Sequence, residues 1–168
     1  MVREKILLTP EGYDRMKNEL NGLIRFRRRE VTERLKEALE FGHFEENTEY
    51  EDAKNEQALV ERRIAELDRI LSSSEVIKKA KDNNVVRLGT RVVIENIGSG
   101  ERINGLIVSS VEADPMEDKI SNKSPVGSAI VGKKVGDEIE VKTPQGNQKY
   151  KILEISNHVL TPEPFEEI

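Results

Sequence analysis

Hydrophobic residues follow two different periods along this chain, and the change falls near residue 80. Up to about residue 78, apolar residues recur every three or four positions, as they do on one face of an α-helix. From about residue 84, short runs rich in valine and isoleucine alternate with glycine-containing turns, a pattern typical of β-strands. We therefore predict an α+β chain with a helical part at residues 1–80, a small sheet domain at residues 81–157 and a flexible tail at residues 158–168.

The helical part is predicted to contain two helices that pack along apolar stripes. The first begins after Thr9, which can cap it, with Pro10 at the first helical position. Its stripe slips by one position near the segment RFRRRE and consists of Tyr13, Met16, Leu20, Leu23, Ile24, Val31, Leu35 and Ala38. The second stripe keeps steps of three and four and consists of Tyr50, Ala53, Gln57, Val60, Ile64, Leu67 and Leu71. Two such stripes predict a coiled coil.

Gly42 lies where the first helix must end, as a left-handed C-terminal cap requires. Because the turn to the second stripe is short, the two helices must run antiparallel. From Tyr13 to Glu40 the first helix would reach about 40 Å. The prediction is a rod with an acidic tip at residues 42–49.

The sheet domain is predicted from two hairpin patterns. Residues 90–111 and 136–155 each contain two strand-like runs around a glycine-containing turn. Between them, Ser124 can cap a short helix whose first residue is Pro125. We predict a small, twisted antiparallel sheet with one short helix.

Charge is segregated along the helical part. The net charge of −5 argues against nonspecific coating of nucleic acid. A basic cluster consists of Arg25, Arg27, Arg28 and Arg29. An acidic cluster follows it and consists of Glu40, Glu45, Glu46, Glu49, Glu51 and Asp52. Such a surface suits a partner with both anionic and cationic features.

The residue types exclude several classes of protein. With no cysteine there is no disulfide framework or thiolate metal site. No apolar run of about 20 residues could cross a bilayer, so we expect a cytoplasmic protein without membrane contact, monomeric when free. The chain lacks a phosphate-binding loop and a serine elbow, and His43 and His158 have no partners for a zinc site. We expect neither an independent enzyme nor a cofactor bound by the chain alone.

The acidic tip is the remaining candidate for chemistry. Clustered carboxylates in a turn usually form a solvated charged surface. Phe44, however, is a large apolar residue at a turn that the hairpin core cannot cover. A tip of this kind could plug an opening in another molecule, or it could bring oxygen ligands to Mg²⁺ in another protein's active centre.

Two segments carry a resemblance to a known family. Residues 41–71, FGHFEENTEY followed by EDAKNEQALVERRIAELDRIL, and residues 119–146, KISNKSPVGSAIVGKKVGDEIEVKTPQG, are similar to bacterial GreA/GreB-type transcript cleavage factors. The resemblance runs from LLTPEGYDRMKNEL to KILEI and leaves only the last dozen or so residues unmatched. It implies a coiled-coil hairpin followed by a domain that resembles FK506-binding proteins. It also implies binding in the secondary channel of RNA polymerase, where the tip stimulates cleavage of backtracked RNA by the polymerase.

The resemblance implies roles for individual residues. Glu46 matches the glutamate of the family's tip pattern G-D-x-x-E-N and would share the polymerase's Mg²⁺, with Glu45 and His43 beside it at the catalytic tip. Residues that pack the tip would be Phe44, Asn47 and Tyr50. Residues that bind the 3′ segment of the nascent RNA would be Arg25, Arg27, Arg28 and Arg29. Residues that dock on the polymerase would be Ser121, Ser124, Pro125, Gly127 and Lys133.

The chain departs from the family pattern at His43, which stands where the family has aspartate. Neutral imidazole is a poor ligand for Mg²⁺. An aspartate at this position would also cap the second helix, with Glu46 completing a capping box, so we expect the N-cap of that helix at residue 43.

Three functions are therefore weighed. The first is a cleavage-stimulating elongation factor. The second is a channel-binding regulator or inhibitor of polymerase with little or no cleavage activity, because of His43. The third is a prolyl isomerase or chaperone-like module, which only the fold of the second domain suggests. For the arginine cluster, pairing with glutamates across the rod is the alternative to RNA contact.

Overall fold

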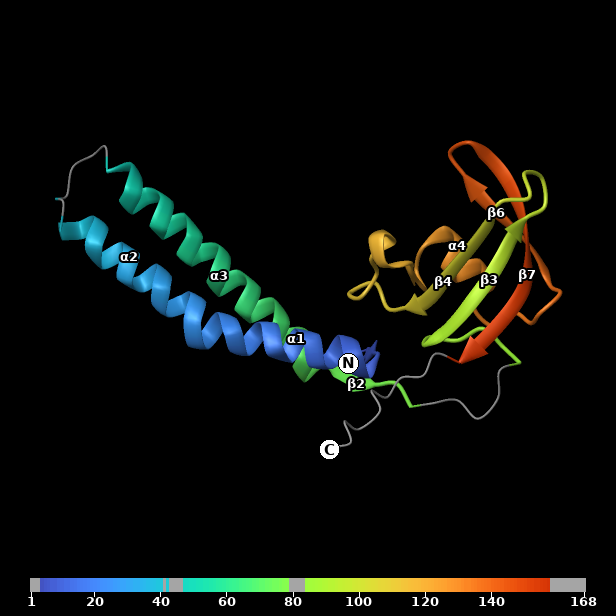
Figure 1. Cartoon of the computed structure of the whole chain (residues 1–168), viewed down its shortest axis with the longest axis horizontal. Helices are drawn as coiled ribbons and strands as arrows, with labels where there is room; N and C mark the ends of the chain where they lie inside the picture. Colours follow the sequence, from blue (N-terminus) through green and yellow to red (C-terminus); the bar gives the residue numbers. More distant parts are fainter. Residues whose placement is uncertain (1–3, 41, 43–46, 79–83, 158–168) are drawn as a thin grey trace, which may run out of the picture. The chain divides into compact units, whose positions relative to one another are not determined.

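The structure is a computed structural model that describes residues 4–40, 42, 47–78 and 84–157 (Figure 1). It contains two compact units. Residues Tyr13–Ser74 belong to the first, and Lys5–Gly12 with the chain from Glu75 onward form the second. The predicted domain limits at residues 80 and 157 fall in or beside stretches outside the described residues, and they stay predictions.

The first unit is a hairpin of helices, as predicted. It is built from α1 (Pro10–Gly22), η1 (Leu23–Arg27), α2 (Arg28–Glu40) and α3 (Thr48–Ser72). Figure 1 shows α2 and α3 side by side, with the chain reversing between them. The predicted cap of α1 is confirmed, because the Gly12 amide donates to Thr9 Oγ1 at 3.0 Å.

The predicted slip of the apolar stripe has a structural cause. Segment η1 is a π-helix, and the Arg28 amide closes it by donating to the Leu23 carbonyl, five residues back. A π-turn holds one residue more than an α-turn, so the residues after it face a new direction. Leu23 consequently packs against Val31, Val60 and Ile64, whereas Ile24 is 42% exposed. The prediction that Ile24 lies in the stripe was wrong.

The rest of the hairpin seam follows the predicted stripes. Its buried side chains are Met16, Val31, Ala38, Ala53, Val60, Ile64, Leu67 and Ile70. Ile70 was missed because it lies next to Leu71, which is only half-buried and had been assigned to the stripe. The alternation of steps predicted the interface correctly, with errors at the two ends of the hairpin base.

The two ends of the tip loop are fixed by Asn47 and Gly42. The Gly42 amide donates to the Leu39 carbonyl at 3.2 Å, and its φ of 106° is the positive value expected where α2 stops. Asn47 is the N-cap of α3 and accepts from the Tyr50 amide at 3.2 Å. Asn47 Nδ2 also donates to the Ala38 and Gly42 carbonyls, at 2.9 and 3.2 Å. The prediction of an N-cap at residue 43 was therefore wrong.

The second unit is a curled five-stranded sheet with one short helix, α4 (Pro125–Ile130) (Figure 1). Its strands, in the order β5-β4-β3-β7-β6, are β3 (Thr90–Asn96), β4 (Arg102–Val108), β5 (Lys119–Ser121), β6 (Glu138–Thr143) and β7 (Gly146–Asn157). Both predicted hairpins are present, as β3–β4 and β6–β7. The sheet is mixed, because β5 pairs with β4 in parallel.

The core of this unit is aliphatic. Alternate residues of β3, Val92 and Ile94, are fully buried, and Ile152 of β7 lies beside them. Helix α4 contributes Ile130 to the same core, and its start is capped as predicted, with Ser124 Oγ accepting from the Gly127 amide at 3.1 Å. Period-two burial along both strands explains why the sequence runs were readable as strands.

An N-terminal segment completes the second unit. Strand β1 (Ile6–Leu8) pairs with β2 (Ser74–Val76), and the chain then enters α1 at Thr9. The buried carboxylate of Glu112 accepts from the Thr9 amide at 2.8 Å and from Thr9 Oγ1 at 2.5 Å. Gly12 passes so close that an added Cβ would lie 1.8 Å from Glu112 Oε1. Among the described residues, no helix is long and apolar enough to span a membrane.

Candidate functional site

The basic cluster lies on η1 and the start of α2, and two of its members pair across the hairpin. Arg27 Nη1 donates to Glu30 at 3.1 Å, and its Nη2 donates to Glu56. Arg28 donates two hydrogen bonds to Glu61 of α3, at 2.7 and 3.0 Å. These bonds raise the pKa of Arg28 above its ordinary value. For Arg27 and Arg28, the alternative of pairing with glutamates is what the structure contains.

The other two members of the cluster point away from such partners. Arg25 and Arg29 are exposed, and neither forms a hydrogen bond or an ion pair within the part of the chain that the structure describes. The cluster that the sequence presented as one unit is therefore divided. Two arginines brace the hairpin, and two carry unneutralised positive charge on its surface.

Further ion pairs hold the hairpin in register. Arg63 of α3 donates to both carboxylate oxygens of Glu19, at 2.7 and 3.0 Å, and to Glu66 at 3.0 Å. The bonds to Glu19 are the main reason that the pKa of Arg63 is raised. Arg34 of α2 pairs with Glu56, the same carboxylate that Arg27 contacts. Charge pairing thus reinforces the apolar seam from both helices.

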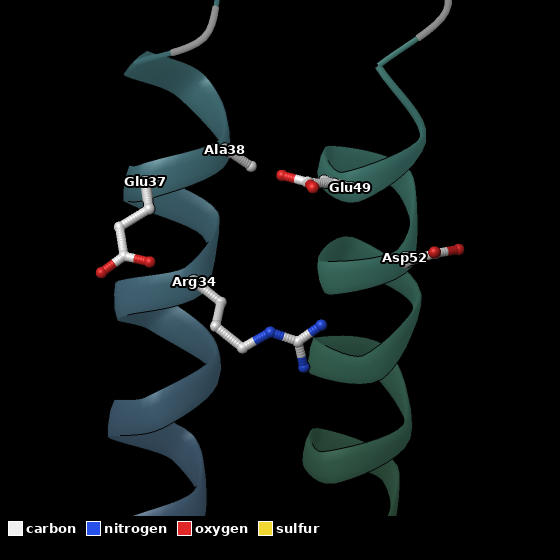
Figure 2. Close-up of a pocket in the computed structure, with 5 residues that line it drawn as sticks. All are labelled: Arg34, Glu37, Ala38, Glu49 and Asp52. Carbon is white, nitrogen blue, oxygen red and sulfur yellow. The ribbon is translucent and has the colours of Figure 1, made fainter.

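Beside the tip loop, α2 and α3 enclose an acidic cleft of about 290 Å³ (Figure 2). The residues that line it are Arg34, Glu37, Ala38, Glu49 and Asp52. Figure 2 shows Arg34 reaching from α2 toward α3, while Glu49 points toward Ala38. No three histidine, aspartate or glutamate side chains within the described ranges are grouped as a metal site requires. The cleft adds negative charge next to the tip, and it is not itself a metal centre.

The predicted catalytic residues His43, Glu45 and Glu46, together with Phe44, lie outside the described residues. The structure does place their neighbours. Asn47 joins the end of α2 to the start of α3 through its side-chain hydrogen bonds, and Tyr50 is half-buried in the first turn of α3. The four residues therefore belong to a short connection whose two ends are held together by one asparagine.

The predicted docking residues surround the start of α4. Ser124 Oγ donates to the Ser121 carbonyl at 2.7 Å, and Ser121 Oγ accepts from the Lys123 amide at 3.1 Å. Gly127 is buried, and a Cβ there would lie 1.9 Å from the Ser121 carbonyl oxygen. These three residues shape the loop, whereas Pro125 and Lys133 expose their side chains.

Sequence reasoning missed two apolar side chains that flank Lys133. Val131 is 41% exposed and Val135 is 55% exposed, on the turn between α4 and β6. Both appear in the sequence as valines next to glycine and lysine, outside any strand pattern. Exposed branched residues in a glycine-rich turn were the available signal for a contact surface.

Comparison with known proteins agrees with this arrangement. The family described as "Transcription elongation factor, N-terminal" matches residues 6–76, and "Transcription elongation factor, GreA/GreB, C-term" matches residues 81–157. The chain belongs to the GreA/GreB family of transcription elongation factors. Factors of the GreA type are accessory elongation factors.

Similar proteins from the GreA/GreB family cover most of the chain. Transcription elongation factor GreA of Clostridium acetobutylicum is 49% identical over 153 residues, which is 90% of this chain and 97% of that protein. GreA of Thermotoga sp. strain RQ2 is 45% identical over 154 residues, covering 92% of this chain and 99% of that protein. The solved structure of GreA factor homolog 1 of Thermus thermophilus is 34% identical over 92% of this chain and all of that chain. Its TM-score of 0.43 is too low for structural likeness to carry an argument.

Proposed function

We propose that this chain binds RNA polymerase through its secondary channel and stimulates cleavage of backtracked RNA in the polymerase's active site. The observation that carries the proposal is the hairpin with a short connection containing Glu45 and Glu46, in a chain of the GreA/GreB family. The braced seam makes the hairpin a stiff carrier for these carboxylates. Relatives at 45–49% identity are GreA factors, which favours this function over a regulator without cleavage.

Glu46 is the proposed working residue of the tip. A carboxylate oxygen suits Mg²⁺, which prefers oxygen ligands and is held in polymerases together with substrate phosphates. When bound, the metal activates water and stabilises the charge that develops on the cleaved phosphate. This chain contributes one ligand and the position of that ligand, which Asn47 fixes from the end of the loop. His43 does not offer an oxygen, and Glu45 provides a second carboxylate beside Glu46.

The proposed docking surface lies on the second unit. Pro125 and Lys133 are exposed there together with Val131 and Val135, which gives an apolar centre with a positive charge beside it. Mixed apolar and charged patches of this kind are typical of surfaces that bind other proteins. The buried Gly127 and the bonded Ser121 and Ser124 support this surface from below.

The test is an RNA cleavage assay in stalled, backtracked elongation complexes, with and without this protein. We expect the added protein to shorten the RNA from its 3′ end and to let the complexes resume synthesis. A protein that binds the complexes, and yet leaves the RNA at its intrinsic rate of cleavage, would refute cleavage stimulation and support the regulator. A protein that does not bind polymerase would refute the proposal as a whole.

A further inference from the structure

An exposed aromatic ring lies between the two arginines that the hairpin leaves without partners. Phe26 is 69% exposed, and within the described residues it is the one aromatic among the exposed large apolar side chains. Its neighbours in sequence are Arg25 and Arg27, and Arg29 follows three positions later. Residues three or four apart adjoin one another on a helix surface, so Phe26 and Arg25 both lie next to Arg29.

The π-turn gives this surface its shape. Because η1 holds an extra residue, residues four apart in it lie more nearly in line along the helix axis than they would in an α-helix. Arg25 and Arg29 therefore project from the same side, while Arg27 and Arg28 turn toward glutamates. π-turns are frequent at functional sites. Here the π-turn separates the paired arginines from the free ones and leaves Phe26 outside the seam.

The chemistry of the surface favours one kind of occupant. Single-stranded nucleic acid binds where cationic side chains follow its backbone and aromatic rings stack on its bases. A pocket on a protein that receives Phe26 would be expected to meet further apolar residues around it. The neighbours of Phe26 on this side are arginines without carboxylate partners, and this favours a polyanion with flat apolar rings.

We propose that Phe26, Arg25 and Arg29 form a subsite for single-stranded RNA, in which Phe26 stacks on a base and the two arginines contact the flanking phosphates. The inference rests on the proposed function, which brings extruded RNA alongside the hairpin. Phe26 and Gly42 are 16 positions apart, which corresponds to about 24 Å along the helices. At roughly 3.4 Å per nucleotide of a stacked strand, only RNA extruded by about seven nucleotides or more can reach Phe26 from the tip.

The experiment measures the affinity of the full chain for two kinds of elongation complex, one backtracked by ten nucleotides and one that is not backtracked. A Glu46→Ala background prevents loss of the RNA during the measurement, and a gel verifies that the RNA is intact. We expect tighter binding to the backtracked complex. Adding Phe26→Leu, which keeps apolar bulk and loses the ring, should remove about fivefold to 100-fold of that preference. Phe26→Tyr should retain it.

Matched controls come from the opposite helix. Leu59 of α3 is 60% exposed, and Arg62 is exposed without a partner among the residues described, so Leu59→Ala and Arg62→Ala should leave the preference unchanged. Replacing Arg25 and Arg29 together with alanine should lower the slope of log affinity against log salt by about 1.4, or 0.7 per phosphate contact. Phe26→Leu should leave that slope unchanged, because stacking releases no counterions.

Three results would overturn the subsite. One is an unchanged preference with Phe26→Leu. Another is an equal loss of affinity for both complexes, which would make Phe26 a contact with protein. The third is a chain that binds both complexes equally well, so that docking stands and the RNA contact does not. Failure to bind either complex, or cleavage by the Glu46→Ala chain, is a failure of the proposed function and is visible separately.

Discussion

Replacing Gly12 with alanine should destabilise the second unit, although alanine is the better helix former. An added Cβ at Gly12 would lie 1.8 Å from Glu112 Oε1 and 2.3 Å from Glu112 Cδ, so the buried carboxylate must move. It then loses its two bonds from Thr9, at 2.8 and 2.5 Å. Bonds to a charged group contribute about 1.5–3 kcal/mol each, and the gain in helix propensity returns at most about 1 kcal/mol. We expect a net loss of about 2–4 kcal/mol.

The matched control lies on the same helix. Gly22 has helical φ and ψ, and an added Cβ would meet nothing within 4 Å, so Gly22→Ala should stabilise the first unit by about 0.5–1 kcal/mol. Because the chain has two compact units, hydrogen exchange resolved by segment is the suitable assay. A loss of 2 kcal/mol corresponds to about 30-fold faster exchange of the protected amides near Thr9 and Glu112 in the Gly12→Ala chain.

A double-mutant cycle isolates the cause. Glu112→Ala alone should also destabilise the segment, because Thr9 loses its partner. In the double variant the added Cβ has no carboxylate to displace, so the two losses should not add. Full additivity, or stabilisation by Gly12→Ala similar to that by Gly22→Ala, would refute the reasoning.

Three further predictions concern the tip and the docking surface. Asn47→Ala should cost about 1 kcal/mol of helix stability and lower cleavage more than polymerase binding, because the tip loop loses its anchor; exchange at the start of α3 and a cleavage assay measure the two effects. His43→Asp should raise cleavage most at low Mg²⁺ by adding an oxygen ligand, and equal activity at all Mg²⁺ concentrations would show that the histidine is tolerated. Lys133→Glu should weaken binding to polymerase by at least about fivefold at low salt and less at high salt, whereas the similarly exposed Lys149→Glu should not.

Local signals predicted the elements whose causes are local. Thr9-Pro10 and Ser124-Pro125 cap their helices because a side-chain oxygen and a fixed φ act within one turn. The one-position slip in the stripe marked the π-turn, although the sequence alone did not say which residue would leave the seam. Ile24 was placed wrongly for that reason, since the extra residue lets Leu23 take the inward position.

Features that depend on distant partners were not predicted. Glu112 and Thr9 are 103 positions apart, and nothing near either residue announces the contact. Strand β5 has only three residues, too few for a period, so its parallel pairing with β4 had no sequence signal. The division of the arginine cluster depends on which glutamates of α3 come opposite, and only the register of the folded hairpin decides it. The N-cap at Asn47 was missed because the family pattern drew attention to residue 43.

The central claim is that this chain lends the carboxylate of Glu46 to the active site of RNA polymerase. The most direct measurement compares Glu46→Ala with Glu45→Ala in cleavage of backtracked RNA and, in parallel, in competition with the unmodified chain for polymerase. A ligand used mainly in the transition state affects rate far more than binding. The account predicts that Glu46→Ala slows cleavage by about 100-fold or more, a loss typical of removing one transition-state stabilising group, with affinity nearly unchanged and Glu45→Ala largely active. Cleavage by the Glu46→Ala chain at the rate of the unmodified chain would contradict it.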